Sequence, residues 1–171
     1  MLGLTDLKVL ELGIAKDAFK ALSGDDKEVC KVLAKTNAAV LKDLEKKRNA
    51  HAFGQLEAAY TEGSGLAALQ TIEALPQDSG QQIANKETAY REFLAKAKVS
   101  RLAHAADLAL GAYLLPKNEA NQDAIPTSAT LYLKLLGDEL PAANEQQLIA
   151  AQAVCLEARV LHWPLAFPQV F

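Results

Sequence analysis

The sequence predicts an all-α fold: an irregular multi-helix bundle with long helices, followed by an extended C-terminal tail rich in proline and aromatic residues. Three observations support this. Half of the 171 residues are apolar and 23% are charged, which is a globular composition. Glycine is sparse, at nine residues, whereas alanine, the best helix former, is abundant. The segment 27–48 contains neither glycine nor proline. We therefore expect one helical body over residues 1–161 and a tail over 162–171.

The N-terminal part of the chain begins with a predicted helix that Thr5 and Asp6 open and Gly13 interrupts. The clearest helix follows residues 23–26, where Ser and Asp side chains are good helix caps and suit the positive end of the helix dipole. It covers residues 27–48, and its apolar residues recur on one face at about 100° per residue. The residues on that face are Val29, Leu33, Val40 and Leu44.

The rest of the body is also predicted to be helical. Helices are expected over the segments 55–60, 65–75, 80–115, 128–136 and 144–161. Pro76 and Pro116 end two of them, because proline cannot continue a helix. The part from 99 to 115 is the most apolar, so we expect it to lie in the core. Pro164 and Pro168 exclude a helix from the tail.

Composition excludes several classes of protein. The formal net charge of −3 gives no overall attraction to nucleic acid or to anionic membranes. Cys30 and Cys155 form neither a disulfide framework nor a zinc set, and a reducing cytoplasm suits them. The first residues lack the basic start and apolar run of a signal peptide, and no apolar stretch approaches the ~18 residues of a membrane span. We expect a cytoplasmic protein that holds no metal or cofactor in this chain.

A basic face on the predicted 27–48 helix is the strongest surface candidate. Its residues fall within an arc of about 100°, opposite the apolar face; they are Lys27, Lys31, Lys35, Lys42 and Lys46. Lysine contacts nucleic-acid phosphates as a point charge, so one interpretation is a DNA-binding surface. Glu28 and Glu45 lie near the same face and no aromatic residue is interleaved with it. A solvated helix face is therefore the alternative interpretation.

Candidate catalytic residues are few. The histidines, which form no metal-ligand spacing, are His51, His104 and His162. His104, Asp107 and Arg101 are spaced to meet on one helix, either as a catalytic group or as a buried polar network that satisfies itself. The Gly63–Gly65 segment follows no strand, so it is interpreted as a turn between helices and not as a cofactor loop.

The tail concentrates apolar and aromatic residues and includes Trp163, the only tryptophan. Such a segment is expected to dock. Its candidate docking residues are His162, Trp163, Leu165, Phe167, Pro168 and Phe171. The surface that receives them is either the parent bundle or a separate partner, and a self-associating version would pair the tails of two chains.

The tail also carries a resemblance. The run from His162 to Phe171, HWPLAFPQVF, resembles the signature His-Trp-x-Leu-x-Phe-Pro-Glu-Val-Phe of large N6-adenine-specific DNA methyltransferases of restriction-modification and phage-defence systems. Gln169 replaces the glutamate of that signature. Residues 24–27 (GDDK) followed by 44–49 (LEKKRN), and residues 102–108 (LAHAADL), are similar to stretches upstream in the same proteins. The resemblance covers most of the chain.

The family resemblance implies a helical segment that lies between two catalytic motifs. These are an upstream glycine-rich loop that binds S-adenosylmethionine and a downstream Asn-Pro-Pro-aromatic motif that holds the target adenine. Neither occurs in these 171 residues, so no catalytic residue is carried over. The expected function is that of a non-catalytic helical fragment of an S-adenosylmethionine-dependent DNA adenine-N6 methyltransferase.

In the intact enzyme, this fragment would brace the catalytic domain or contact duplex DNA, and its partner would be the remainder of the methyltransferase polypeptide. The target base would be flipped out of the duplex, as chemistry on a stacked base requires. The alternative function is a free-standing helical protein–protein interaction module that docks through its C-terminal tail.

Overall fold

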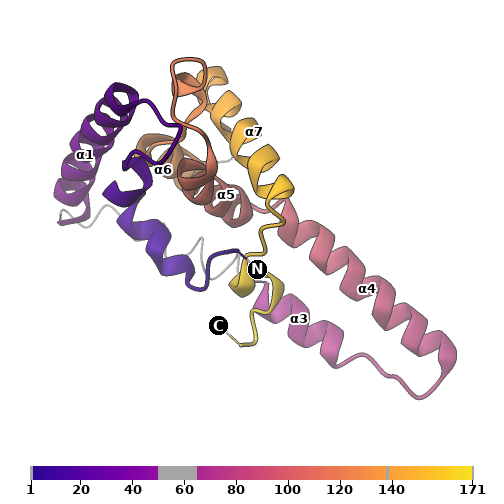
Figure 1. Ribbon diagram of the computed structural model, residues 1–171. Coiled ribbons are helices and arrows are strands. Elements are labelled where there is room, and N and C mark those ends of the chain that lie inside the picture. Colours follow the sequence, from indigo (N-terminus) through magenta and orange to yellow (C-terminus); the bar gives the residue numbers. More distant parts are fainter. Residues whose placement is uncertain (1, 50–64, 138, 171) are drawn as a thin grey trace.

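The computed structural model describes residues 2–49, 65–137 and 139–170, and within these ranges it contains helices and no β-strand (Figure 1). The predicted all-α class is therefore confirmed. Some of the predictions made from the sequence fall outside these ranges. They concern His51, the predicted helix at 55–60, Gly63, Ser64 and Phe171. In the described part of the chain, no helix has the length and apolar character needed to cross a membrane.

The N-terminal segment forms two short 3₁₀ helices where the sequence predicted an α-helix. η1 covers Leu7–Leu12, and the Asp6 carboxylate accepts a hydrogen bond from the Lys8 amide (2.8 Å) at its start. Gly13 ends η1, as predicted, and η2 covers Lys16–Phe19. Short 3₁₀ turns let the chain change direction often, and in this way Leu7, Leu10, Ile14 and Phe19 all reach the core.

The helix α1, Lys27–Asn49, matches its prediction closely. The Asp26 carboxylate caps it by accepting hydrogen bonds from the amides of Glu28 (2.7 Å) and Val29 (3.2 Å). Val29 and Leu33 are buried, and the buried Asn37 joins the same face. The Asn37 amide donates to the Ile14 carbonyl (2.7 Å) and accepts from the Ser128 amide (2.8 Å), so one side chain ties α1 to two distant segments.

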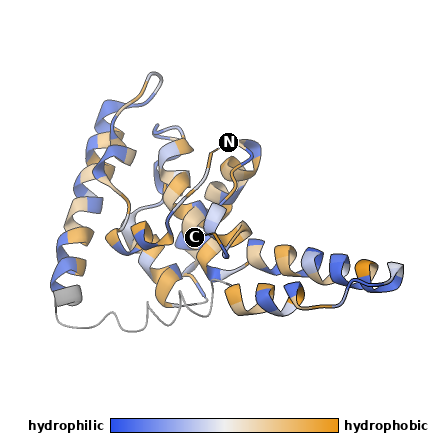
Figure 2. Ribbon diagram, turned by 90° about the horizontal axis from the view of Figure 1, so that it is seen from below, coloured by the Kyte–Doolittle hydropathy of each residue, from blue (hydrophilic) through white to orange (hydrophobic). Residues whose placement is uncertain are grey.

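The predicted run from 80 to 115 is two helices and not one. α4 covers Gly80–Lys98 and α5 covers Arg101–Leu114. The break has a local cause, since the Ser100 hydroxyl accepts a hydrogen bond from the Ala103 amide (3.1 Å) and so caps a new helix. The break lets α4 leave the body of the molecule beside α3, Leu66–Glu73, as a projecting hairpin (Figures 1 and 2).

The core is organised around α5, as the sequence predicted from its apolar composition. α5 packs against α6, Ser128–Leu136, and against α7, Ala142–Glu157; the short η3, Gln122–Ala124, lies before α6. A Cβ atom on Gly111 would lie 2.5 Å from the Cβ of Ala151, so small residues allow α5 and α7 to approach closely. The buried residues that α5 contributes are Leu102, Ala103, Ala105, Ala106, Leu108, Gly111 and Ala112.

The C-terminal part differs from its prediction in two ways. α7 ends at Glu157, not at 161, because Arg159 takes a left-handed conformation (φ 52°) and the Val160 amide bonds back to the Cys155 carbonyl (2.9 Å). The tail is also not wholly extended, since residues Trp163–Ala166 form the short helix α8. The prediction that proline excludes helix was wrong here, because Pro164 lies in the first turn, where its missing N–H has no helical partner to lose.

The tail lies against the N-terminal segment, so both ends of the described chain lie close together (Figure 1). The amides of Leu161 and Trp163 donate to the carbonyls of Leu2 (2.8 Å) and Leu4 (3.0 Å). A Cβ atom on Gly3 would lie 1.6 Å from the Leu161 carbonyl oxygen, so only glycine allows this crossing.

Candidate functional site

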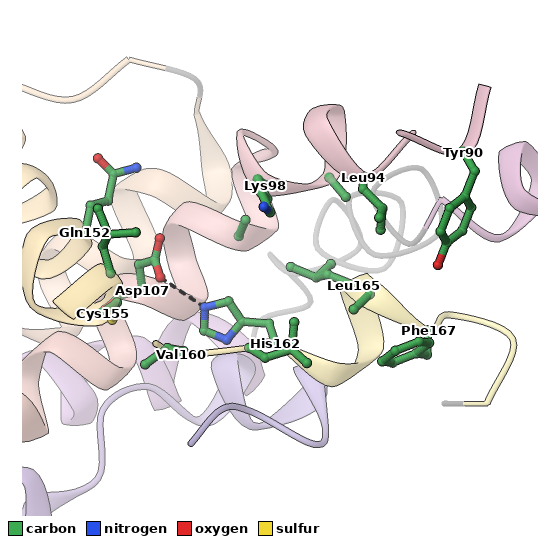
Figure 3. Close-up of a pocket in the computed structure, with 15 residues that line it drawn as sticks. Tyr90, Leu94, Lys98, Asp107, Gln152, Cys155, Val160, His162, Leu165 and Phe167 are labelled. Carbon is green, nitrogen blue, oxygen red and sulfur yellow. Dashed lines mark hydrogen bonds and ion pairs between the residues drawn. The ribbon is translucent and has the colours of Figure 1, made fainter. Parts of the chain in front are cut away.

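A pocket of about 560 Å³ lies where α4, α5, α7 and the tail meet (Figure 3). This volume is in the range of small-molecule sites. The wall combines apolar side chains with a few polar ones, and α4 faces the tail across it. The residues labelled in Figure 3 are Tyr90, Leu94 and Lys98 from α4, Asp107 from α5, Gln152 and Cys155 from α7, and Val160, His162, Leu165 and Phe167 from the C-terminal segment.

A hydrogen bond between Asp107 and His162 joins α5 to the tail at one side of this pocket (Figure 3). The His162 Nε2 atom lies 3.0 Å from the Asp107 Oδ1 atom, and the two side chains are only 10% and 17% exposed, respectively. His162 Nδ1 is buried and has no hydrogen-bond partner among the described residues. A proton there would be a buried donor without an acceptor, so we assign the proton to Nε2, which donates to the carboxylate.

This geometry limits the chemistry of the pair. A general base must offer an open nitrogen within reach of a substrate proton. His162 has one nitrogen bonded to Asp107 and the other sealed in the interior. The pair is therefore arranged to hold the tail on α5, and it does not present a base to the pocket.

The Cys155 thiol is similarly unsuited to catalysis. Its Sγ atom donates a weak hydrogen bond to the Asp107 carbonyl (3.7 Å). Burial raises the pKa of this thiol strongly, and the nearby Asp107 carboxylate raises it further. The thiol stays protonated at neutral pH, and the thiolate is the nucleophilic form.

The group predicted from His104, Asp107 and Arg101 does not assemble as a site. Asp107 bonds to His162 and not to His104, whose Nδ1 atom is buried and finds no hydrogen-bond partner in the part of the chain that the structure describes. Burial lowers the pKa of His104, the positive charge of Lys134 lowers it further, and Asp107 opposes both. The helical spacing was compatible with a bond between His104 and Asp107, but the fold brings a different imidazole to the carboxylate.

The five predicted DNA-binding lysines are all exposed, on the side of α1 opposite its buried residues. Lys31 forms an ion pair with Glu28, at 2.6 Å between Nζ and Oε1. Both side chains of this pair are largely exposed, so it adds little to stability. The predicted arrangement of the helix is present, while contact with DNA stays a prediction.

The tail docks on its own chain. Pro164, Leu165 and Pro168 are buried, and Leu165 belongs to the main hydrophobic core. Trp163 and Phe167 are half-buried, with ring centroids 5.9 Å apart. Of the two surfaces considered for the tail, the parent bundle receives these residues, and packing on it accounts for their apolar character.

Sequence reasoning missed the pocket and the Asp107–His162 bond. The two residues are 55 positions apart, so no helical periodicity relates them. The pocket is formed by four separate segments whose apolar residues resemble ordinary core positions.

Comparison with known proteins adds no identification: no family model, curated protein or solved structure matches this chain.

Proposed function

We propose that this chain is a non-catalytic helical segment of an S-adenosylmethionine-dependent DNA adenine-N6 methyltransferase. One observation carries the proposal. Asp107 lies in the 102–108 stretch and His162 opens the tail, and these two separately resembling stretches meet in a hydrogen bond of 3.0 Å. The resemblance of both stretches to the same family supports the proposal, and the hydrogen bond joins them within one fold.

The proposed role of the bundle is to hold the tail in one place. The contacts that hold it are together called the tail anchor. They are the Asp107–His162 bond, the backbone bonds of Leu161 and Trp163 to the N-terminal segment, and the buried Leu165. In the intact enzyme, the tail would lead into the catalytic domain. An anchored tail would start that domain at a defined position relative to the helices.

The basic face of α1 is proposed to contact DNA phosphates in the same enzyme. Each phosphate contact made by a lysine releases counterions and steepens the dependence of binding on salt. With all five lysines engaged, the logarithm of the binding constant should fall with the logarithm of salt concentration at a slope of roughly −4.5, from about −0.9 per phosphate.

Duplex binding tests this DNA contact. Fluorescence anisotropy with a labelled duplex is measured across a salt series for the wild type and for a variant with Lys31→Glu, Lys35→Glu and Lys42→Glu. The matched control reverses exposed lysines elsewhere, Lys8, Lys20 and Lys96. Each set includes one lysine in an ion pair, since Lys20 bonds to Asp17 (2.9 Å) and Lys31 to Glu28. Loss of binding only in the first variant supports the contact, and no binding at low salt refutes it.

The methyltransferase assignment itself is tested on the intact gene product. The coding sequence on both sides of this segment is read and the full polypeptide is assayed for transfer of labelled methyl groups to duplex DNA. We expect N6-methyladenine in the product. A reading frame with no methyltransferase motifs on either side would refute the assignment, whatever the DNA-binding result.

The second function, a protein–protein interaction module that docks through its tail, would require the tail to leave its own bundle. Leu165 would have to withdraw from the core and His162 from Asp107. Light scattering over a range of protein concentrations tests the self-associating form. That form predicts that the average molar mass rises with protein concentration, and that Leu165→Ala alters this rise.

A further inference from the structure

The pocket between α4 and the tail has features that neither the proposed scaffold role nor DNA contact uses. It is a surface pocket of about 560 Å³, a volume in the range of small-molecule sites. Leu94, Leu165 and Phe167 line it, so its interior favours an apolar guest (Figure 3).

Polar groups on the pocket wall are unequally satisfied. In the described part of the chain, neither the Lys98 ammonium, the Tyr90 hydroxyl nor the Gln152 amide has a hydrogen-bond or ion-pair partner. All three offer donor hydrogens. Asp107, by contrast, is mostly buried and already accepts a hydrogen bond from His162.

This imbalance favours an anionic guest. Lys98 is an exposed cation at the edge of the pocket and has no counterion among the residues that the structure describes, which suits an anionic head group. The Asp107 carboxylate on another part of the wall repels an anion, so it would turn the head group toward Lys98.

We propose that this pocket binds an apolar carboxylic acid, with its hydrocarbon body between α4 and the tail and its carboxylate at Lys98. The ligand's carboxylate accepts hydrogen bonds from the Lys98 ammonium. The hydrocarbon body packs on Leu94, Leu165 and Phe167. The proposal is independent of the methyltransferase assignment, because it rests only on the pocket of this chain.

Titration with decanoate tests the binding. Trp163 is the only tryptophan, and its ring is tilted against that of Phe167, which lines the pocket, so its fluorescence reports occupancy. We expect saturable decanoate binding that also raises the melting temperature. Decyltrimethylammonium, with the same chain and the opposite charge, is expected to bind at least tenfold more weakly. No saturable binding of decanoate, or equal binding of the cation, overturns the proposal.

Two pairs of variants test the location of the head group and of the body. Lys98→Glu is expected to weaken decanoate binding about tenfold or more, while Lys96→Glu, exposed on the same helix, leaves it within twofold. The second pair tests the position of the hydrocarbon body. Ala97 lines the pocket, so Ala97→Phe places a large side chain at its wall and is expected to abolish binding. Ala95 is exposed on the same helix, so Ala95→Phe is expected to retain binding. Lys98 is on the surface, so its variant is expected to fold. Equal affinities within either pair would place the acid elsewhere and overturn the proposal.

Discussion

The bond between Asp107 and His162 is the contact most open to a decisive test. Replacing Asp107 with Ala removes the acceptor of a side chain that is 10% exposed. Within the described ranges, the His162 Nε2–H group then has no partner, and its Nδ1 atom already has none. An unsatisfied buried donor costs about 1–3 kcal/mol, so Asp107→Ala is expected to lower the free energy of unfolding by about 2 kcal/mol.

A double-mutant cycle measures how much of this effect is the interaction free energy between the Asp107 and His162 side chains. Asp107→Ala, His162→Ala and the double variant are unfolded in urea, with Glu92→Ala, an exposed acid on α4, as the control. The double variant should lose less than the sum of the single variants, with a coupling of about 1 kcal/mol. Additivity within about 0.3 kcal/mol would refute the interpretation that these two side chains stabilise each other.

Hydrogen exchange then shows where the effect is felt. The amides of Leu161 and Trp163 are bonded to the N-terminal segment, so they report whether the tail stays in place. In Asp107→Ala these two amides should exchange faster than the loss of global stability explains. Amides in the middle of α5 should change only by the amount that the global free energy of unfolding changes. Uniform acceleration across the chain would mean that the bond supports the whole fold and is no specific anchor of the tail.

Three further predictions concern the core. Asn37→Ala should cost about 2–4 kcal/mol in urea unfolding, because it leaves buried backbone groups, including the Ser128 amide, without partners; near-neutral stability would contradict this. Gly111→Val should lower the melting temperature by several degrees, since even a Cβ atom would lie 2.5 Å from Ala151, and a normal melting temperature would show that α5 and α7 can separate freely. Burial lowers the pKa of His104 below its ordinary 6.5, so the unfolded state binds more protons than the folded state between these two pKa values. The free energy of unfolding should therefore fall as the pH decreases from 6.5 toward the folded pKa. Urea unfolding at pH 5 and 7 measures this dependence, which His104→Gln should flatten.

Local signals in the sequence predicted most of the helices. α1 has an apolar face, an acidic cap and no breaker, and its observed bounds, Lys27–Asn49, agree with the prediction of 27–48. The errors were local as well. Ser100 was not recognised as a cap, so α4 and α5 were merged, and Pro164 was interpreted as excluding helix although the first turn tolerates it.

The candidate site was much less predictable. Side chains on one helix can be related by its period, and on that basis His104 was matched with Asp107. The partner that Asp107 takes instead comes from the tail, 55 residues later, because the tail packs across α5 and against the N-terminal segment. The residues next to Asp107 and His162 in the sequence give no sign that the tail packs across α5.

The amino-acid sequence by itself determined the all-α class, the positions of most helices and the basic face of α1, because caps, breakers and apolar periodicity act within a few turns of chain. Only the tertiary structure decided that the tail docks on its own bundle, that Asp107 bonds to His162, and that α4 leaves a pocket beside the tail. These features depend on how segments far apart in the chain fit against one another, and shape complementarity of that kind has no local signature in sequence.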